Sequence, residues 1–118
     1  MNKYLADLIE RMNDRSDQIL ESGYDSGKTI SWKALREAEK LSNPEYIPQL
    51  ITYIDNEKDK KNRNRAYFIL GHLSKNLDDI KSMNFLISRI DKEKDKYIIS
   101  SLLNRIQDLK KPYRTDLQ

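Results

Sequence analysis

Apolar side chains recur along the chain at the spacing of an α-helix rather than of a β-strand. In six segments they stand three or four residues apart, which places them on one face of a helix. The segments predicted to be helical cover residues 2–21, 29–41, 45–54, 62–75, 77–90 and 96–110. No segment shows the strict alternation of apolar and polar residues that a half-buried strand requires. The pattern therefore predicts an all-α fold.

Turn-forming residues separate these segments. Two glycines fall within residues 22–27, where we expect a loop between the first and second helices. Asn43-Pro44 is expected to end the second helix, because the residue before a proline is pushed out of the helical region. Lys111-Pro112 is expected to end the sixth helix in the same way. Short connections between the helices predict three helical hairpins.

One stretch of the chain occurs twice. Residues 54–60 return as residues 90–96 with a single change, at a distance of 36 residues. The same offset relates apolar positions outside this stretch, which pair as Leu50 with Leu86, Ile51 with Ile87, Leu70 with Ile106 and Leu73 with Leu109. A period of about 33 to 47 residues is typical of stacked helical hairpins. We therefore predict a right-handed α-solenoid of about three hairpins.

Residues 42–54 resemble the first helix of a HEAT repeat, of the short bacterial kind first described in phycobilisome lyases. Pro44, Ile47, Pro48 and Leu50 match the pattern of that helix, and Asn43 stands in place of its aspartate. The second helix of the family has an aspartate, an arginine, an alanine and a Leu-Gly pair, which residues 59–71 match. The resemblance covers about residues 29–110 and implies structural roles for Pro44, Pro48, Asp59, Arg63, Ala66, Leu70 and Gly71. It implies that Asp59 and Arg63, which are spaced to pair with each other, make contacts between neighbouring repeats.

The repeat pattern divides one domain, residues 1–118, into four parts. Residues 1–42 are expected to form a divergent N-terminal capping hairpin, because a terminal repeat must turn a polar face to water. Residues 43–76 form the second repeat and residues 77–111 the third, which has Ile99 where the family has arginine. Residues 112–118 are either a tail or the truncated start of a further repeat. Self-association through the C-terminal end therefore remains open.

The composition excludes several kinds of functional site. There is no cysteine, which excludes disulfides, thiolate zinc sites and a cysteine nucleophile. The single histidine, His72, has no metal-ligand spacing around it, and no phosphate-binding loop or nucleophile motif occurs. We therefore expect a protein that is not an enzyme and that binds no cofactor or metal.

Charged residues make up 35% of the chain and apolar residues 37%, which suits a thin solenoid with much surface. The regular apolar spacing argues against the rival interpretation, disorder. No apolar run is long enough to span a membrane. Asp7 interrupts the N-terminal segment where a signal peptide needs apolar residues, so we expect a cytoplasmic protein.

Basic residues gather at positions 58–65 and again at Lys92, Lys94 and Lys96, and the repeat places both clusters on one edge. Acidic residues lie between them, so the edge is either a self-neutralising loop region or a phosphate-binding surface. Trp32, Tyr67 and Tyr97 lie near the second helix of successive hairpins, where they either anchor a partner or, as we favour for Tyr67, fill the core. The candidate partner-binding residues are Trp32, Arg36, Lys60, Arg63, Tyr67, Lys96 and Tyr97.

These features predict a non-catalytic protein–protein interaction module: an adaptor, regulatory or immunity-type scaffold. In HEAT solenoids the second helices line the concave face, where we expect the partner to bind. The alternative is a nucleic-acid-binding protein related to the HEAT-like DNA alkylation-repair glycosylases, which the net charge of +3 permits. A basic concave face would favour nucleic acid, and an apolar or mixed face would favour protein.

Overall fold

The structure is a computed structural model that describes residues 1–17 and 29–116, with side chains as far as residue 109. The helices are α1 (Lys3–Met12), α2 (Ile30–Ala38), α3 (Tyr46–Asn56), α4 (Lys60–Leu77), α5 (Ile80–Arg89) and α6 (Lys96–Asp116). All the regular structure in the described residues is helical, which confirms the predicted all-α class. The loop expected at residues 22–27 lies outside the described residues.

Side chains at the helix starts explain where most of the helices begin. Asn2, Thr29, Asp59, Asp79 and Asp95 each accept a hydrogen bond from a backbone N–H in the first turn of the helix that follows. Such N-caps satisfy donors that have no partner within the helix. The cap at Asp59 starts α4 at Lys60, two residues before the predicted start.

Several predicted helix boundaries are wrong. The second helix ends at Ala38 rather than at residue 41, so it stops before Asn43-Pro44, which we expected to end it. The first helix ends at Met12, because Asp14 accepts a hydrogen bond from the Ser16 backbone N–H at 2.8 Å and turns the chain locally. The fifth helix begins at Ile80 rather than residue 77, because α4 continues to Leu77 and Asp78 then takes a left-handed conformation.

The predicted end of the sixth helix is also wrong. Helix α6 continues through Pro112 to Asp116, where we expected an end at residue 111. A proline removes one backbone hydrogen bond and crowds the carbonyl four residues earlier, which disfavours a helix interior without forbidding it.

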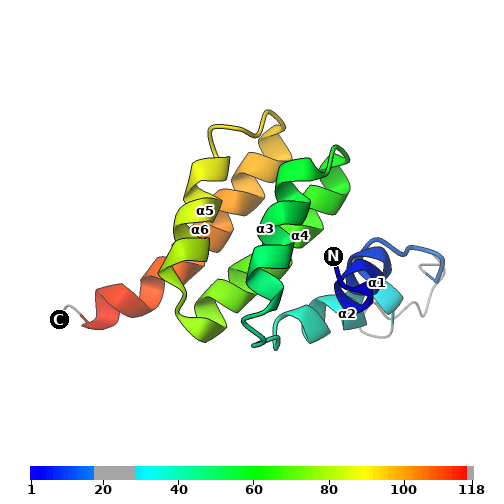
Figure 1. The fold of residues 1–118 in the computed structure, drawn as a ribbon, viewed down its shortest axis with the longest axis horizontal. Coiled ribbons are helices and arrows are strands. Elements are labelled where there is room, and N and C mark those ends of the chain that lie inside the picture. Colours follow the sequence, from blue (N-terminus) through cyan, green and yellow to red (C-terminus); the bar gives the residue numbers. More distant parts are fainter. Residues whose placement is uncertain (18–28, 117–118) are drawn as a thin grey trace, which may run out of the picture.

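The hairpins α3–α4 and α5–α6 lie side by side, and α1 and α2 lie on the other side of α3–α4 (Figure 1). Contacts between α4 and α6 and between α3 and α5 join the two C-terminal hairpins. Helices α1 and α2 pack mainly on each other and reach the remaining helices mainly through α4, with a smaller contact between the stacked rings of Tyr4 in α1 and Tyr46 in α3. Helix α4 therefore contacts every other helix of the described chain.

The repeat of 36 residues is also visible in the core. Leu50 and Leu86 are both fully buried, and the pairs Leu70 with Ile106 and Leu73 with Leu109 are buried as well. Equivalent residues of α3–α4 and α5–α6 thus have equivalent places in one hydrophobic core. Within the described residues, no helix combines the length and the apolar character that crossing a bilayer requires.

Candidate partner-binding surfaces

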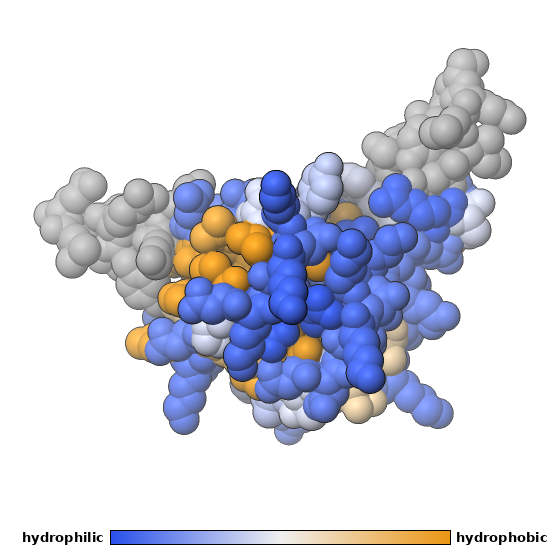
Figure 2. All heavy atoms as spheres, turned by 90° about the horizontal axis from the view of Figure 1, so that it is seen from above, coloured by the Kyte–Doolittle hydropathy of each residue, from blue (hydrophilic) through white to orange (hydrophobic). Residues whose placement is uncertain are grey.

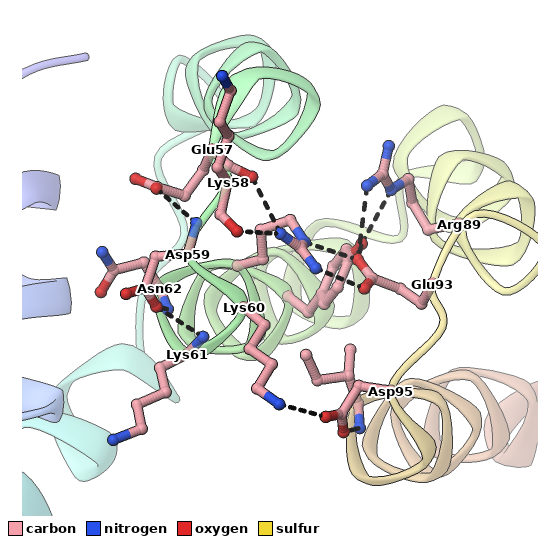
Figure 3. Close-up of polar contacts among 12 residues, drawn as sticks. Glu57, Lys58, Asp59, Lys60, Lys61, Asn62, Arg89, Glu93 and Asp95 are labelled. Atoms are coloured by element: carbon pink, nitrogen blue, oxygen red, sulfur yellow. Dashed lines mark hydrogen bonds and ion pairs between the residues drawn. The ribbon is translucent and has the colours of Figure 1, made fainter.

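The two copies of the repeated stretch each contain an aspartate that caps the helix after it, Asp59 and Asp95 (Figure 3). Asp59 accepts hydrogen bonds from the backbone N–H groups of Lys61 and Asn62 at 2.8 and 3.1 Å. Asp95 does the same for the two residues two and three positions after it, at 2.9 and 3.2 Å. In both copies of the repeated stretch, the aspartate therefore caps the second helix of its hairpin. Asp59 is therefore a helix cap, and its expected pairing with Arg63 is wrong.

Arg63 reaches the neighbouring hairpin instead. Its Nη2 and Nε lie 2.8 Å from the two carboxylate oxygens of Glu93, in the loop after α5. Its Nη1 donates to the backbone carbonyls of Glu57 and Lys58 at 3.1 and 2.9 Å. Such a bidentate pair fixes both the distance and the orientation of its two groups. Arg63 thus joins both loops.

The Glu93 carboxylate is buried at the centre of a larger polar cluster. It also accepts a hydrogen bond from the Tyr67 hydroxyl, and Arg89 Nη2 lies 3.4 Å away. Arg89 Nε donates to the Tyr67 hydroxyl at 2.8 Å, and Arg89 Nη1 lies 3.2 Å from Asp55 Oδ1. We call Arg63, Tyr67, Arg89, Glu93 and Asp55 the hairpin joint. Its members belong to α3, α4, α5 and the loop that follows α5.

Electrostatics keep the Glu93 carboxylate ionised within the hairpin joint. Burial alone would raise the pKa of the Glu93 carboxyl, but hydrogen bonds from Arg63 and Tyr67 outweigh it and hold this pKa below its ordinary value. Burial and the nearby carboxylate raise the pKa of Tyr67 to about 12, so its hydroxyl stays protonated and donates. Charges and donors therefore match within the joint, which suits a structural contact rather than a ligand site.

The basic residues of the two loops share one edge of the molecule. Lys58, Lys60, Lys92 and Lys94 line the same shallow hollow as Glu93 and Asp95. Lys60 Nζ lies 2.7 Å from Asp95 Oδ2, so the interleaved acids do neutralise part of this edge. Two further candidates follow at the start of α6: Lys96 is exposed, and Tyr97 is 86% exposed.

The other candidates lie elsewhere. Trp32 is 40% exposed, and the Arg36 guanidinium carbon stands 4.9 Å from the centroid of its ring. Arg36 also pairs with Glu39, and this group lines a hollow on α2 away from the loops. Tyr67 is only 1% exposed, so as a partner-binding candidate it is wrong, because its ring fills the core and its hydroxyl serves the hairpin joint. The structure thus places the candidates in three locations rather than on one surface.

A different surface, which we call the second-helix groove, is lined by residues of α2, α4 and α6 alone. Its volume is about 230 Å³, and its walls include Leu35, Asn64, Arg65, Phe68, Asn104 and Arg105. In the sequence we counted Arg65 only as part of the basic cluster and did not consider Arg105. One available signal was the dipeptide Asn-Arg, which occurs at residues 62–63, 64–65 and 104–105.

Arg65 lies in an unusual environment for a cation. Its Nε donates to Asn13 Oδ1 at 2.9 Å, and Asn13 in turn donates to Asn62. Among the described residues no carboxylate forms an ion pair with Arg65. Burial, followed by the charge of Arg15, lowers the pKa of the Arg65 guanidinium. The groove therefore contains a half-buried positive charge held by a neutral amide.

Arg105 forms the opposite wall of the groove. Its guanidinium carbon lies 5.3 Å from the centroid of Phe68, and its Nη1 lies 3.1 Å from His72 Nε2. Burial, together with the charge of Arg105, lowers the pKa of His72, so the neutral imidazole accepts this hydrogen bond. A Cβ on Gly71 would meet Arg105 Cδ at 3.2 Å, so the glycine lets α6 and its arginine approach α4 closely.

None of these surfaces contains the groups of a metal centre. Among the described side chains, no three of the His, Asp and Glu residues lie close enough together to hold a metal ion. No family model matches the chain, and comparisons with curated proteins and with solved structures give no match either. The likeness to HEAT repeats therefore rests on the residues of this chain alone and stays a prediction.

Proposed function

We propose that this chain is a non-catalytic protein-interaction module built as a small HEAT-like α-solenoid, and that its second-helix groove binds an acidic segment of a partner protein. The repeat part of the proposal is supported by the equivalent caps at Asp59 and Asp95 and by the equivalent core residues Leu50 and Leu86. It is supported also by the side-by-side packing of the two hairpins that carry them.

The observation that carries the functional part is the half-buried Arg65. Five other arginines (Arg11, Arg36, Arg63, Arg89 and Arg105) each lie against a carboxylate of the same chain. Removing a cation from water is unfavourable unless a negative group compensates it. A carboxylate from another molecule, entering the groove, would supply the counter-charge that the described residues do not provide for Arg65.

The other walls of the groove suit a peptide better than a nucleic acid. The side-chain amides of Asn64 and Asn104 and the hydroxyl of Ser101 offer hydrogen bonds to a peptide backbone. Leu35 and Phe68 offer apolar surface. Nucleic-acid binding depends on many simultaneous phosphate contacts. The groove has two arginines, and one of them, Arg105, already lies 3.5 Å from Asp108.

A displayed library of random peptides, selected on the immobilised full chain, tests this proposal. We expect enrichment of Asp and Glu beside an apolar residue. Synthesised peptides would then be measured by fluorescence anisotropy against the wild type and the variants Arg65→Gln and Lys81→Gln. Lys81 is an exposed lysine of α5 outside the groove, so its variant removes the same charge as a matched control.

We expect Arg65→Gln to weaken binding at least about tenfold, since hydrogen bonds to charged groups are worth about 1.5–3 kcal/mol. Lys81→Gln should leave the affinity unchanged. Selection of peptides without acidic residues, or equal affinities for wild type and Arg65→Gln, would contradict the proposal. A duplex DNA oligonucleotide that binds more tightly than the peptides near physiological salt would favour the nucleic-acid alternative instead.

A further inference from the structure

Exposed apolar side chains gather on one side of the α5–α6 hairpin. Ile80, Ile87 and Leu103 are 64%, 41% and 43% exposed, far more than the buried residues of the core. Figure 2, seen from the end that carries the two loops, shows apolar side chains together on the α5–α6 side of a largely hydrophilic surface. Exposed apolar residues scattered singly need no explanation, but a contiguous group marks a surface that is covered by something.

Contacts on the opposite flanks fix the direction in which this group points. On α5, Arg89 contacts Asp55 and Tyr67 of the α3–α4 hairpin. On α6, Arg105 contacts His72 of α4. At 3.6 residues per turn, Met83, Ile87 and Ile90 lie on the other flank of α5, and Ile99 and Leu103 lie on the other flank of α6. Ile87 and Leu103 therefore face away from α3–α4, while Met83 and Ile90, beside them, are partly buried against the core.

The repeat shows what the same positions do one hairpin earlier. Residues 36 positions before Met83, Ile87 and Ile90 are Ile47, Ile51 and Ile54, which are buried or partly buried in α3. Those 36 positions before Ile99 and Leu103 are Arg63 and Tyr67, which hold Glu93 of the next hairpin. The apolar surface of α5–α6 is thus the equivalent of an interface that the protein already uses.

The same comparison indicates which occupant fits. A further hairpin of the α5–α6 kind would bring a buried carboxylate equivalent to Glu93, and Ile99 and Leu103 offer it neither a cation nor a hydroxyl. Burying that carboxylate without a partner would be costly. The surface instead suits an apolar partner surface without charge. Its own six residues (Ile80, Met83, Ile87, Ile90, Ile99 and Leu103), which we call the end face, have that property.

We propose that the end face is a self-association site, at which two copies of this chain pair face to face about a two-fold axis. Such pairing brings no like charges together at the centre of the interface, although each chain carries a net charge of +3. An isologous pairing of one face with itself closes after two copies, so it produces a dimer rather than a fibre. The proposal does not depend on the second-helix groove.

Sedimentation velocity over a concentration series of the full chain tests the proposal. We expect the wild type to shift from monomer to dimer as its concentration rises. Ile87→Lys and Leu103→Lys should stay monomeric at concentrations where the wild type is dimeric, because each places a charge in the interface. Both positions are partly exposed in the single chain, so circular dichroism should show that both variants remain folded. Tyr97→Lys, at an exposed position of α6 outside the end face, is the control and should dimerise as the wild type does.

A charge-pairing experiment distinguishes direct face-to-face pairing of the two end faces from a loss of dimer that the substitutions cause indirectly. The double variants Ile87→Lys with Leu103→Lys and Ile87→Glu with Leu103→Glu should each be monomeric alone and should form a mixed dimer when combined. A wild type that stays monomeric at its highest soluble concentration overturns the proposal. So does a dimer that survives both single substitutions, an assembly that grows beyond two copies, or a failure of the two double variants to combine.

Discussion

At the scale of single residues, the structure differs most from the sequence prediction in how it treats charges. Because Glu93 lies in a highly charged loop, the sequence predicts that it is exposed to solvent. In the structure its carboxylate is buried and binds Arg63, Tyr67 and Arg89. A buried carboxylate is tolerated only when its oxygens are satisfied and its charge is balanced. The hairpin joint supplies both, so Glu93 is a structural residue.

Replacing Glu93 by glutamine should destabilise the protein by about 3–5 kcal/mol, the usual cost of leaving buried charges unpaired. Glutamine keeps the size of the side chain, but Arg63 loses its counter-charge and Arg89 keeps only Asp55. Urea unfolding followed by circular dichroism measures the change. Glu10→Gln, at an exposed position of α1, is the matched control and should stay within about 0.5 kcal/mol of the wild type. A loss below about 1 kcal/mol for Glu93→Gln would show that the joint contributes little.

His72 should make the stability depend on pH in a defined window. The folded protein lowers the pKa of His72, so as the pH falls the unfolded chain binds the proton first. The contribution of this group is therefore fully present above the ordinary histidine pKa of about 6.5 and is lost as the pH falls below it. The carboxyls of Glu37 and Glu93 have lowered pKa values, so they act only at lower pH.

Thermal melts between about pH 7.5 and 5 should show the wild type losing stability on acidification. The His72→Gln variant should lose less over the same interval. Parallel pH profiles for the two proteins would mean that folding does not lower the pKa of His72.

The candidate site shows why sequence reasoning finds some residues and misses others. Trp32 and Tyr97 are exposed, and their residue type alone made them candidates. Tyr67 has the same residue type but is buried, because Glu93, distant in sequence, accepts its hydrogen bond. Arg65 matters because no carboxylate of the described part of the chain forms an ion pair with it, and that depends on the packing of α1, α4 and α6. Contacts between distant segments are not visible in one sequence.

At the scale of elements, the apolar spacing predicted all six helices of the described chain and most of their starts. The starts were predictable because capping side chains act locally. The ends were less so: Asp14 stops α1 early, Asp78 allows α4 to extend and delays α5, and Pro112 lies within α6. Helix ends depend on the balance between local turn chemistry and the packing that a longer helix gains.

The caps of the second helices can be tested directly. Asp59→Ala should cost about 0.5–2 kcal/mol, since two backbone N–H groups at the start of α4 lose their acceptor. Asp59→Asn should retain nearly all the stability, because asparagine caps about as well as aspartate. Urea unfolding distinguishes the two variants. Equal losses would indicate that the negative charge of Asp59, rather than its cap, stabilises α4.

At the scale of the whole molecule, α4 contacts all the other helices, while α1 and α2 form a pair attached mainly through α4, with a smaller contact between α1 and α3. This arrangement differs from a uniform stack, in which each hairpin contacts its neighbours equally. It suggests that stability is unevenly distributed. A lesion in α4 should disrupt every hairpin, and a lesion in α1 should be confined to the N-terminal pair.

The variants Leu70→Asp and Leu8→Asp test this difference. Both leucines are fully buried, so each substitution places an unpaired carboxylate in the core at a cost of several kcal/mol. Leu70→Asp should lose nearly all of the helical circular dichroism signal, because α4 contacts every other helix. Leu8→Asp should keep most of that signal and a cooperative melt, because α3 to α6 retain their mutual contacts.

Hydrogen exchange measured by mass spectrometry locates the effect. In Leu8→Asp, protection should be lost in α1 and α2 and kept in α4 and α6. Leu103→Asp, at a half-exposed leucine of the end face, is the control for the substitution itself and should remain helical throughout. If Leu8→Asp unfolds the chain as completely as Leu70→Asp does, the N-terminal pair is an integral part of a single cooperative unit rather than an attachment to it.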